Sequence, residues 1–267
     1  YITKWCYYCS KQGLNPLKAP VNAGAEFLAD LFYSTKLEYS ALNTARSALS
    51  AVLEPVDSLS FGKQPIIKRL MRGIFKERPT LPKYTVTYDV DLVFNRIVNS
   101  PLHILDLKTL TFRVATLLCI LSGQRSQTLG VMNINFMHKE DTRYIFFISE
   151  LIKQSRPTFH QAPLEFVSYR DNVCICPVAH IQHYLEETKA IRGSQTEFFI
   201  SYAPPYKAVK SSTIAKWVVM FLKECGVNTK VFSAHSTRSA STSKSLKNGL
   251  SLQDLGKAAG WSGSSTF

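Results

Sequence analysis

The sequence predicts a mainly α protein with a small antiparallel β-sheet, an α+β arrangement. Apolar residues recur at helical spacing along most of the 267 residues, which is typical of amphipathic helices packed around a core. Only residues 144–149 and 162–167 have the β-branched and aromatic composition that indicates strands. Two prolines in the basic stretch 78–84 mark an extended linker, so we expect two domains.

The first domain is predicted to cover residues 1–82 and to be a small helical module. Helices are expected over residues 23–34, 40–53 and 64–76, and Pro55 ends the second. Residues 1–20 contain loop-forming Gly, Asn and Pro residues and the pair Cys6 and Cys9. No second ligand pair follows nearby, so we interpret both cysteines as structural thiols and not as zinc ligands.

The second domain is predicted to cover residues 83–267. We expect helices over residues 89–98, 106–121, 177–190, 212–225, 238–247 and 252–259. The helix over 106–121, rich in Leu, Val and Ile, should form the centre of this domain. Gly123 breaks it, and a new helix begins at Ser126, so Arg125 should lie at a helix junction. The two strands should form a hairpin or three-stranded sheet with Lys153 near the turn.

The charge of the chain favours a polyanionic partner. Lys and Arg number 32 against 19 Asp and Glu, a formal net charge of +13. Nucleic acid is the usual partner of such a protein. Between Lys63 and Lys83 there are seven basic residues and one acid, a local net charge of +6. A solvated helix face would explain such a run, but a basic helix that leads into a basic linker suits two domains closing around a duplex. The predicted DNA-binding residues are Arg46, Lys68, Arg69, Arg72, Lys76, Arg78 and Lys83.

Other classes of partner and ligand are not expected. No apolar run approaches the roughly 20 residues of a membrane-spanning helix, and no signal peptide is visible at the start. Six scattered cysteines indicate reduced thiols in a nuclear or cytosolic protein, not a secreted one. Cys174, Cys176, His180 and His183 are spaced more closely than the ligands of usual structural zinc sites. We therefore predict no metal, no other cofactor and no small-molecule substrate.

The stretch 232–241 carries the strongest chemical signal. His235 and Arg238 lie one helical turn apart at the start of a predicted helix, so both can face one target. An imidazole that exchanges protons near neutral pH, beside the five N–H donors of a guanidinium group, suits a phosphate that is attacked or released. Ser233, Ser236, Thr237 and Ser239 could cap the helix start. Taken alone, the pattern also fits a capped helix with an exposed His and Arg.

The ordered set of Arg125, Lys153, His235, Arg238 and Trp261 resembles the active-site signature of the tyrosine recombinase (phage integrase-like) family. Residues 121–129, Leu-Ser-Gly-Gln-Arg-Ser-Gln-Thr-Leu, are similar to its first-arginine motif. The sequences of residues 152–157, 235–242 and 259–262 are most similar to those of recombinases from eukaryotic DIRS-type and Crypton-like mobile elements. The resemblance covers essentially the whole chain, and implies a helical core-binding (SAM-like) domain followed by a catalytic domain.

The resemblance implies transesterification at a DNA phosphodiester through a 3′-phosphotyrosyl intermediate, without metal or ATP. Arg125 and Arg238 would hold the non-bridging oxygens, Lys153 would protonate the leaving 5′ oxygen, and His235 would transfer protons around the nucleophile. The indole N–H of Trp261 could donate to the phosphate. Double-stranded DNA is the implied partner, with a homo-oligomer, a tetramer on DNA, when the protein is full-length.

The sequence departs from the family pattern at the nucleophile. The family tyrosine follows the position of Trp261 by about nine or ten residues, whereas this sequence ends at Phe267 and has no tyrosine after Tyr206. We therefore expect either a fragment of a recombinase or a non-catalytic DNA-binding protein derived from one. A helical protein-interaction domain with a basic surface is a third possibility. Retention of Lys153 and His235 together favours the first.

Overall fold

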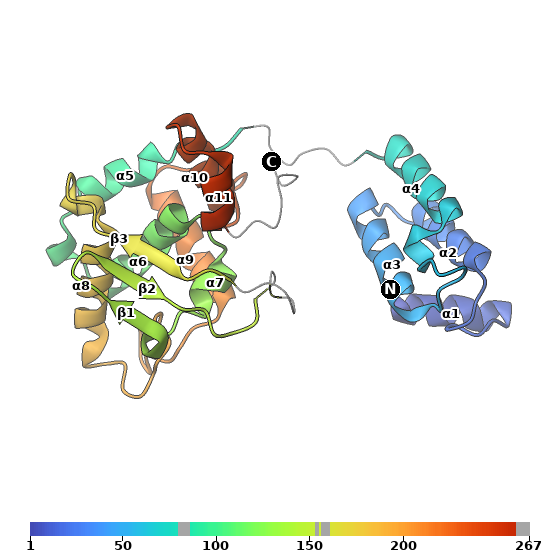
Figure 1. The fold of residues 1–267 in the computed structure, drawn as a ribbon, viewed down its shortest axis with the longest axis horizontal. Coiled ribbons are helices and arrows are strands. Elements are labelled where there is room, and N and C mark those ends of the chain that lie inside the picture. Colours follow the sequence, from blue (N-terminus) through green and yellow to red (C-terminus); the bar gives the residue numbers. More distant parts are fainter. Residues whose placement is uncertain (80–85, 153–154, 156–160, 260–267) are drawn as a thin grey trace. The chain divides into compact units, whose positions relative to one another are not determined.

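A computed structural model describes residues 1–79, 86–152, 155 and 161–259, the side chains of 257–259 excepted. The chain divides into two compact units, Tyr1–Lys83 and Tyr84–Phe267. The described residues are mostly helical, with one three-stranded antiparallel sheet in the second unit (Figure 1). The predicted α+β class is therefore confirmed.

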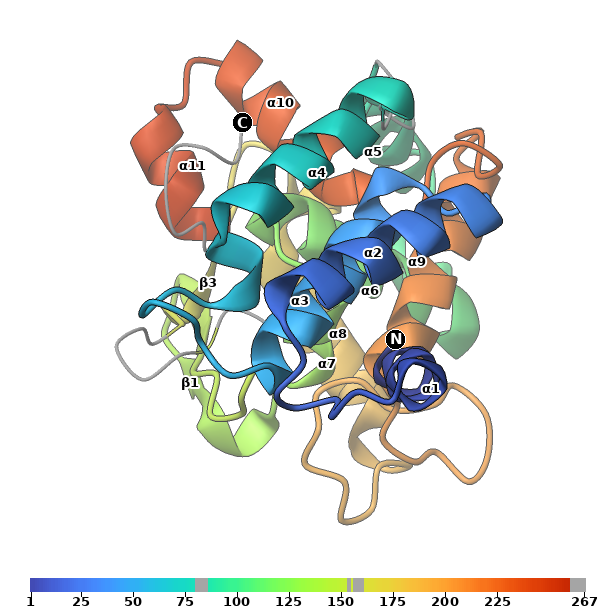
Figure 2. The ribbon, with the colours of Figure 1, turned by 90° about the vertical axis from the view of Figure 1, so that its right-hand side faces the viewer.

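The described residues of the first unit form helices and connecting loops, with no β-strand. The helices are α1 (Ile2–Gln12), α2 (Val21–Ser34), α3 (Tyr39–Val52), the 3-10 turn η1 (Phe61–Lys63) and α4 (Pro65–Glu77). Helix α1 contacts α3, while α2, α3 and α4 contact one another; Figure 2 shows α1 nearly along its axis. The sequence prediction missed α1, because Trp5 and Cys9 are the only side chains of this helix that are buried. Nε1 of Trp5 donates a 2.8 Å hydrogen bond to the carbonyl of Pro16, which ties α1 to the loop that follows it.

Helix α4 has a buried apolar face and an exposed basic face, as its sequence predicts. Proline at its first position suits the first turn of a helix, where a backbone N–H would have no helical partner. Ile67, Met71 and Ile74 are buried in the core of the unit. The basic residues of α4 lie on the exposed side.

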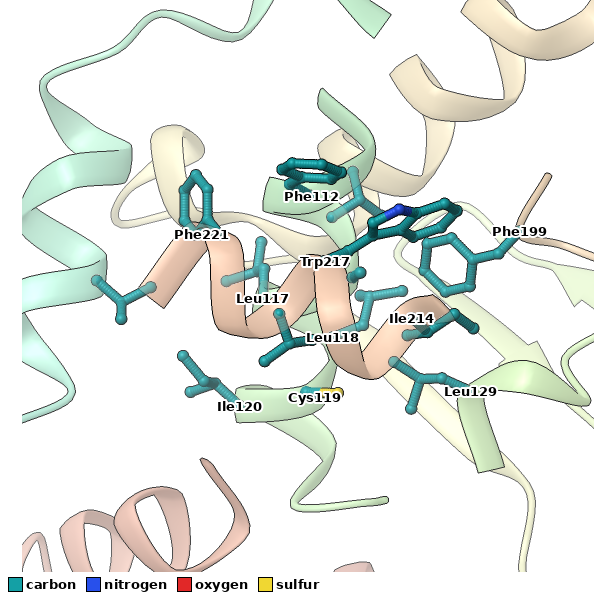
Figure 3. Close-up of a cluster of buried hydrophobic side chains, with 14 of the residues drawn as sticks. Phe112, Leu117, Leu118, Cys119, Ile120, Leu129, Phe199, Ile214, Trp217 and Phe221 are labelled. Atoms are coloured by element: carbon teal, nitrogen blue, oxygen red, sulfur yellow. The ribbon is translucent and has the colours of Figure 1, made fainter. Parts of the chain in front are cut away.

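The second unit is built around α6. Its helices are α5 (Asp91–Val98), α6 (Leu107–Ser122), α7 (Ser126–Gly130), α8 (Pro177–Lys189), α9 (Ser211–Glu224), α10 (Ser236–Lys247) and α11 (Leu252–Ala259), with 3-10 turns η2 (Leu102–Ile104), η3 (Ile134–Phe136) and η4 (Val173–Ile175). Residues 110–120 of α6 are all buried, where α8, α9 and α10 pack around the helix. Figure 3 shows Trp217 of α9 between Phe112 of α6 and Phe199. The predicted central helix is thus confirmed.

The sheet covers another side of α6. Strands β1 (Met137–Lys139), β2 (Arg143–Phe146) and β3 (Leu164–Val167) pair in the order β1-β2-β3, all antiparallel. Leu164 and Phe166 of β3 are buried and alternate with exposed residues, as expected for a strand with one face on a core. In β2, Tyr144, Ile145 and Phe146 are all buried. The sequence prediction did not locate β1, which has only three residues and no fully buried side chain.

Candidate functional site

Arg125 is positioned by the end of the buried helix α6. Gly123 takes a left-handed conformation with φ 59°, which glycine adopts at little cost, and so ends the helix as predicted. Gln124 is buried, and Arg125 then forms the extended N-cap of α7. The side chain of Arg125 is half-buried. Its Nη1 atom is buried and makes no hydrogen bond to any described residue.

Helix α10 brings His235 and Arg238 close to Arg125. The hydroxyl of Ser241 on α10 donates a hydrogen bond to the carbonyl of Ile120, near the end of α6 that precedes Arg125. His235 is the N-cap residue of α10, and its side chain makes no capping hydrogen bond. The expected capping by Ser233 and Ser236 is therefore wrong in detail: the backbone N–H of Ser233 donates to the hydroxyl of Ser236 at 3.0 Å and closes the turn before the helix.

Residues from the start of the second unit support α10 from another side. The ring of Tyr88 meets that of Phe232 edge-on, with centroids 5.7 Å apart. Tyr88 also lies beside Thr237, next to Arg238 in the sequence, and burial raises the pKa of this tyrosine. Further along the helix, Nζ of Lys244 lies 2.6 Å from a carboxylate oxygen of Asp91 on α5. These contacts fix the helix that carries Arg238.

The two arginines are electrostatic neighbours. Arg238 is buried to 6% exposure, and burial together with the charge of Arg125 lowers its pKa to about 10. Arg238 therefore stays positively charged near neutral pH. Two like charges held together in a partly desolvated place repel each other, and an anion that contacts both would relieve this cost.

Arg125 and His235 also line a common pocket of about 630 Å³. The remaining lining residues are Ser126, Gln127, Ala215, Lys216, Val219, Met220, Ser233 and Ala234. Lys216 of α9 is exposed and adds a second basic side chain, besides Arg125, to the pocket. The sequence analysis missed Lys216, because a lysine on the outer face of an amphipathic helix carries no signal of its own.

The structure thus brings together three of the five predicted catalytic residues: Arg125, His235 and Arg238. Lys153 and Trp261 lie outside the described residues, and so does Lys83 of the predicted DNA-binding set. The chemical roles assigned to all five stay predictions.

Four predicted DNA-binding residues lie on the exposed side of one helix. Lys68, Arg69, Arg72 and Lys76 are all exposed on α4. Tyr39 and Phe75 add an edge-on aromatic pair, with centroids 5.2 Å apart, to a pocket that Arg69, Arg72 and Lys76 also line. A solvated face and a DNA-binding face would both have this distribution of charge.

Arg78 and Arg46 differ from the predicted DNA-facing arrangement. The guanidinium group of Arg78 donates to the carbonyls of Thr35 and Leu37, at 3.2 and 2.6 Å, and lies over the ring of Phe32 at 4.2 Å. It therefore fastens the segment after α2. Arg46 is half-buried beside Gly62, and its Nε atom is buried.

The described residues offer no cluster of three or more His, Cys, Asp or Glu side chains that could hold a metal ion. His180, one of the residues weighed as a ligand, is fully buried and hydrogen-bonded through both ring nitrogens, to Arg113 and to the Cys176 carbonyl. Nor does this part of the chain contain a helix of the length and apolar character needed to cross a bilayer.

Comparison with known proteins gives fold neighbours only. No family model and no curated protein matches the sequence. Among solved structures, the chain is similar to the XerH site-specific recombinase bound to difH substrate, a pre-cleavage complex, with 15% identity and a TM-score of 0.57 over 92% of this chain and 65% of that one. The chain thus spans less than two thirds of the length of that relative.

Two further neighbours have the same kind of fold. The Tn1549 transposon integrase in complex with transposon right end DNA is 13% identical, with a TM-score of 0.59 over 92% of this chain and 78% of that one. A lambda integrase dimer bound to a COC′ core site is 16% identical, with a TM-score of 0.51 over 98% of this chain and 87% of that one. The fold therefore resembles that of tyrosine recombinases. The narrower resemblance to DIRS-type and Crypton-like recombinases stays a prediction.

Proposed function

We propose that this protein is a tyrosine recombinase or integrase, which cleaves and rejoins DNA strands through a 3′-phosphotyrosyl intermediate. The observation that carries the proposal is the placement of Arg125 and Arg238, which come from separate helices and lie together despite their mutual repulsion. His235 lies in the same site. The fold neighbours, whose names describe recombinases and integrases on DNA, support the same reading.

Two guanidinium groups suit the transition state of this reaction. Attack on a phosphodiester produces a pentacoordinate phosphorus with additional negative charge on its non-bridging oxygens. Arginine binds such oxygens through paired N–H donors, and preorganised donors in a partly desolvated site stabilise developing charge strongly. The repulsion between Arg125 and Arg238 in the unliganded protein is then offset when the phosphate arrives.

The remaining roles follow the family resemblance. His235, exposed at the start of α10, would transfer protons around the attacking hydroxyl. Lys153 would protonate the departing 5′ oxygen, and Trp261 would donate to the phosphate. No tyrosine is among the described residues that line the pocket, and the nucleophile of this proposal comes from another part of this polypeptide or from another polypeptide.

The partner in this proposal is double-stranded DNA, contacted by both units, with a homo-oligomer assembled on it. The exposed basic residues of α4 would bind phosphates without reading sequence. A recombinase of a eukaryotic mobile element would act on DNA in the nucleus, so the proposal includes a nuclear location, or a cytoplasmic one before entry into the nucleus. The reaction needs no metal or organic cofactor, because the arginine pair supplies the positive charge.

The test is covalent trapping with the full-length natural protein and a nicked suicide duplex. We expect a protein–DNA band that survives denaturation. Arg125→Gln or Arg238→Gln should reduce the rate of its formation about 100-fold or more, the usual effect of removing one preorganised donor. The matched control is Arg96→Gln, because Arg96 is an exposed arginine of α5 that bonds to Ser100.

Arg96→Gln should leave the band unchanged. A folded protein that binds duplex DNA yet forms no band would support the alternative, a non-catalytic DNA-binding protein derived from a recombinase. A band of full intensity in both arginine variants would contradict the assigned site.

A further inference from the structure

The pocket beside Arg125 is lined by residues of two chemical kinds. Arg125, Lys216 and His235 supply positive charge or exchangeable protons. Apolar side chains line it as well: Ala215, Val219, Met220 and Ala234. A phosphate group would contact residues of the first kind and leave the apolar side chains without a ligand contact.

The apolar residues that α9 contributes to the pocket are held in place by the packing of this helix. Trp217, Val218 and Phe221 anchor this helix in the core, which leaves Val219 and Met220 on the outward face. Gly130 at the end of α7 approaches the first residue of α9 so closely that a Cβ atom on it would lie 3.2 Å from the backbone of Ser211. Helices α7 and α9 are therefore packed closely against each other beside the pocket.

Met220 is unusual among these apolar residues. Its side chain is 46% exposed, although α9 has a large buried face on which an apolar residue could have been placed. An exposed apolar side chain costs little by itself. Beside cationic groups in a concave site, however, it suits a ligand that has both an anionic and an apolar part.

A nucleotide in duplex DNA is such a ligand. Its phosphate carries the charge, and among the base edges in the major groove only thymine presents an apolar group, the C5-methyl. We infer that Val219 and Met220 contact the methyl group of a thymine close to the reacting phosphate. This inference rests on the proposed function. Contact with that methyl group would make this pocket contribute to the choice of target sequence.

The first experiment measures how much each single thymine methyl group contributes to DNA affinity. Duplexes that bind tightly are selected from a random-sequence pool, and each thymine of the best duplex is replaced in turn by deoxyuridine, which lacks only the methyl group. At one position the wild-type protein should lose about fourfold in affinity, the factor expected for one buried methyl-sized group. Met220→Ser should abolish this difference, whereas Met220→Leu should keep it.

The matched control is Val98→Ser, because Val98 is an apolar residue of α5 with a similar exposure of 41%. This variant should discriminate thymine from deoxyuridine as the wild type does. A binding assay that shows no methyl effect at any position, or an effect that Met220→Ser leaves intact, would overturn the inference.

Methionine methyl NMR locates the contact independently. The chain has four methionines, of which Met71 belongs to the first unit and Met132 is fully buried. On addition of the selected duplex, the Met220 methyl signal should shift more with thymine than with deoxyuridine at the critical position, while those of Met71 and Met132 should not distinguish the two. An equal Met220 shift with both duplexes would contradict the assigned contact.

The experiments distinguish failure of this inference from failure of the proposed function. If the proposed function is correct and this inference is not, the covalent adduct forms and depends on Arg125, but deoxyuridine is tolerated at every position. If the proposed function is wrong, the adduct does not form.

Discussion

Nε of Arg113 donates a 2.9 Å hydrogen bond to Nε2 of His180 inside the core of the second unit. The same guanidinium group also donates to the carbonyls of Ser100, at 2.5 Å, and Cys174, at 3.2 Å. Arginine can only donate, so Nε2 of His180 carries no proton. Nδ1 must then hold the proton and donate to the carbonyl of Cys176, 2.8 Å away. His180 is therefore neutral in the folded protein, and the network joins α6 and α8.

This network predicts a specific dependence of stability on pH. Burial, and secondarily the charge of Arg113, lowers the pKa of His180 from 6.5 to about 4. Between these values the unfolded chain binds a proton that the folded chain does not, so stability rises with pH in this window. The contribution should be fully present above pH 6.5 and should be lost as the pH falls toward 4, by an amount on the order of 3 kcal/mol. Urea unfolding at several pH values measures it.

His183 provides the control on the same helix. His183→Gln should retain most of the pH dependence of the wild type, because the charge of His183 is the smallest of the causes that lower the pKa of His180. His180→Gln should have a flatter profile between pH 6.5 and 4 and a lower stability at neutral pH, because its substitution disturbs an acceptor of the buried Arg113. Identical profiles for His180→Gln and the wild type would show that another group causes the effect.

Two glycines of the first unit should respond oppositely to alanine. A Cβ atom on Gly24 of α2 would collide with the ring of Phe61, so Gly24→Ala should destabilise the protein by about 1–3 kcal/mol. Gly73 of α4 has open space around it, so Gly73→Ala should stabilise by roughly 0.5–1 kcal/mol through helix propensity. Unfolding free energies of the two variants test this, and a stabilising Gly24→Ala would show that α2 and Phe61 are not packed as described.

Much of the fold could be predicted because its long helices have one clearly apolar face. The helix over 106–121 was expected from its Leu, Val and Ile content, and the observed α6 differs by one residue at each end. The strands of residues 144–149 and 162–167 were expected as well, although β2 and β3 are shorter. Helix α1 and strand β1 were not found, because each buries too few side chains to produce a periodic pattern.

The site could be predicted only in part. Spacing within one helix related His235 to Arg238, but only the resemblance to a family related them to Arg125. The contact that unites them, from Ser241 to the carbonyl of Ile120, involves a serine with no distinguishing sequence signal. Val219 and Met220 likewise carried no functional signal in the sequence, because their proposed role depends on Arg125 and Lys216, which lie near them only in the folded protein. Arg78 shows the opposite error, since a basic residue in a basic stretch proved to bind carbonyls of its own unit.

The exposed face of α4 predicts a sequence-independent contribution to DNA binding. Replacing Lys68, Arg69 and Arg72 by Ala should weaken binding to all duplexes alike and reduce the slope of log affinity against log salt by up to about three. The control replaces Lys4, Lys11 and Lys36, three exposed lysines elsewhere in the same unit, by Ala. Equal slopes for the α4 variant and the wild type would remove this face from the interface.

The central claim is that Arg125 and Arg238 bind one phosphate, and a double-mutant cycle of DNA affinity tests it most directly. Arg125→Gln, Arg238→Gln and the double variant are compared with the wild type on one duplex at one salt concentration, after circular dichroism has verified that each is folded. Residues that share a partner are energetically coupled, so the loss in the double variant should differ from the sum of the single losses by about 0.5 kcal/mol or more. Losses that add within about 0.3 kcal/mol would mean that the two arginines act on separate groups, and would contradict the account.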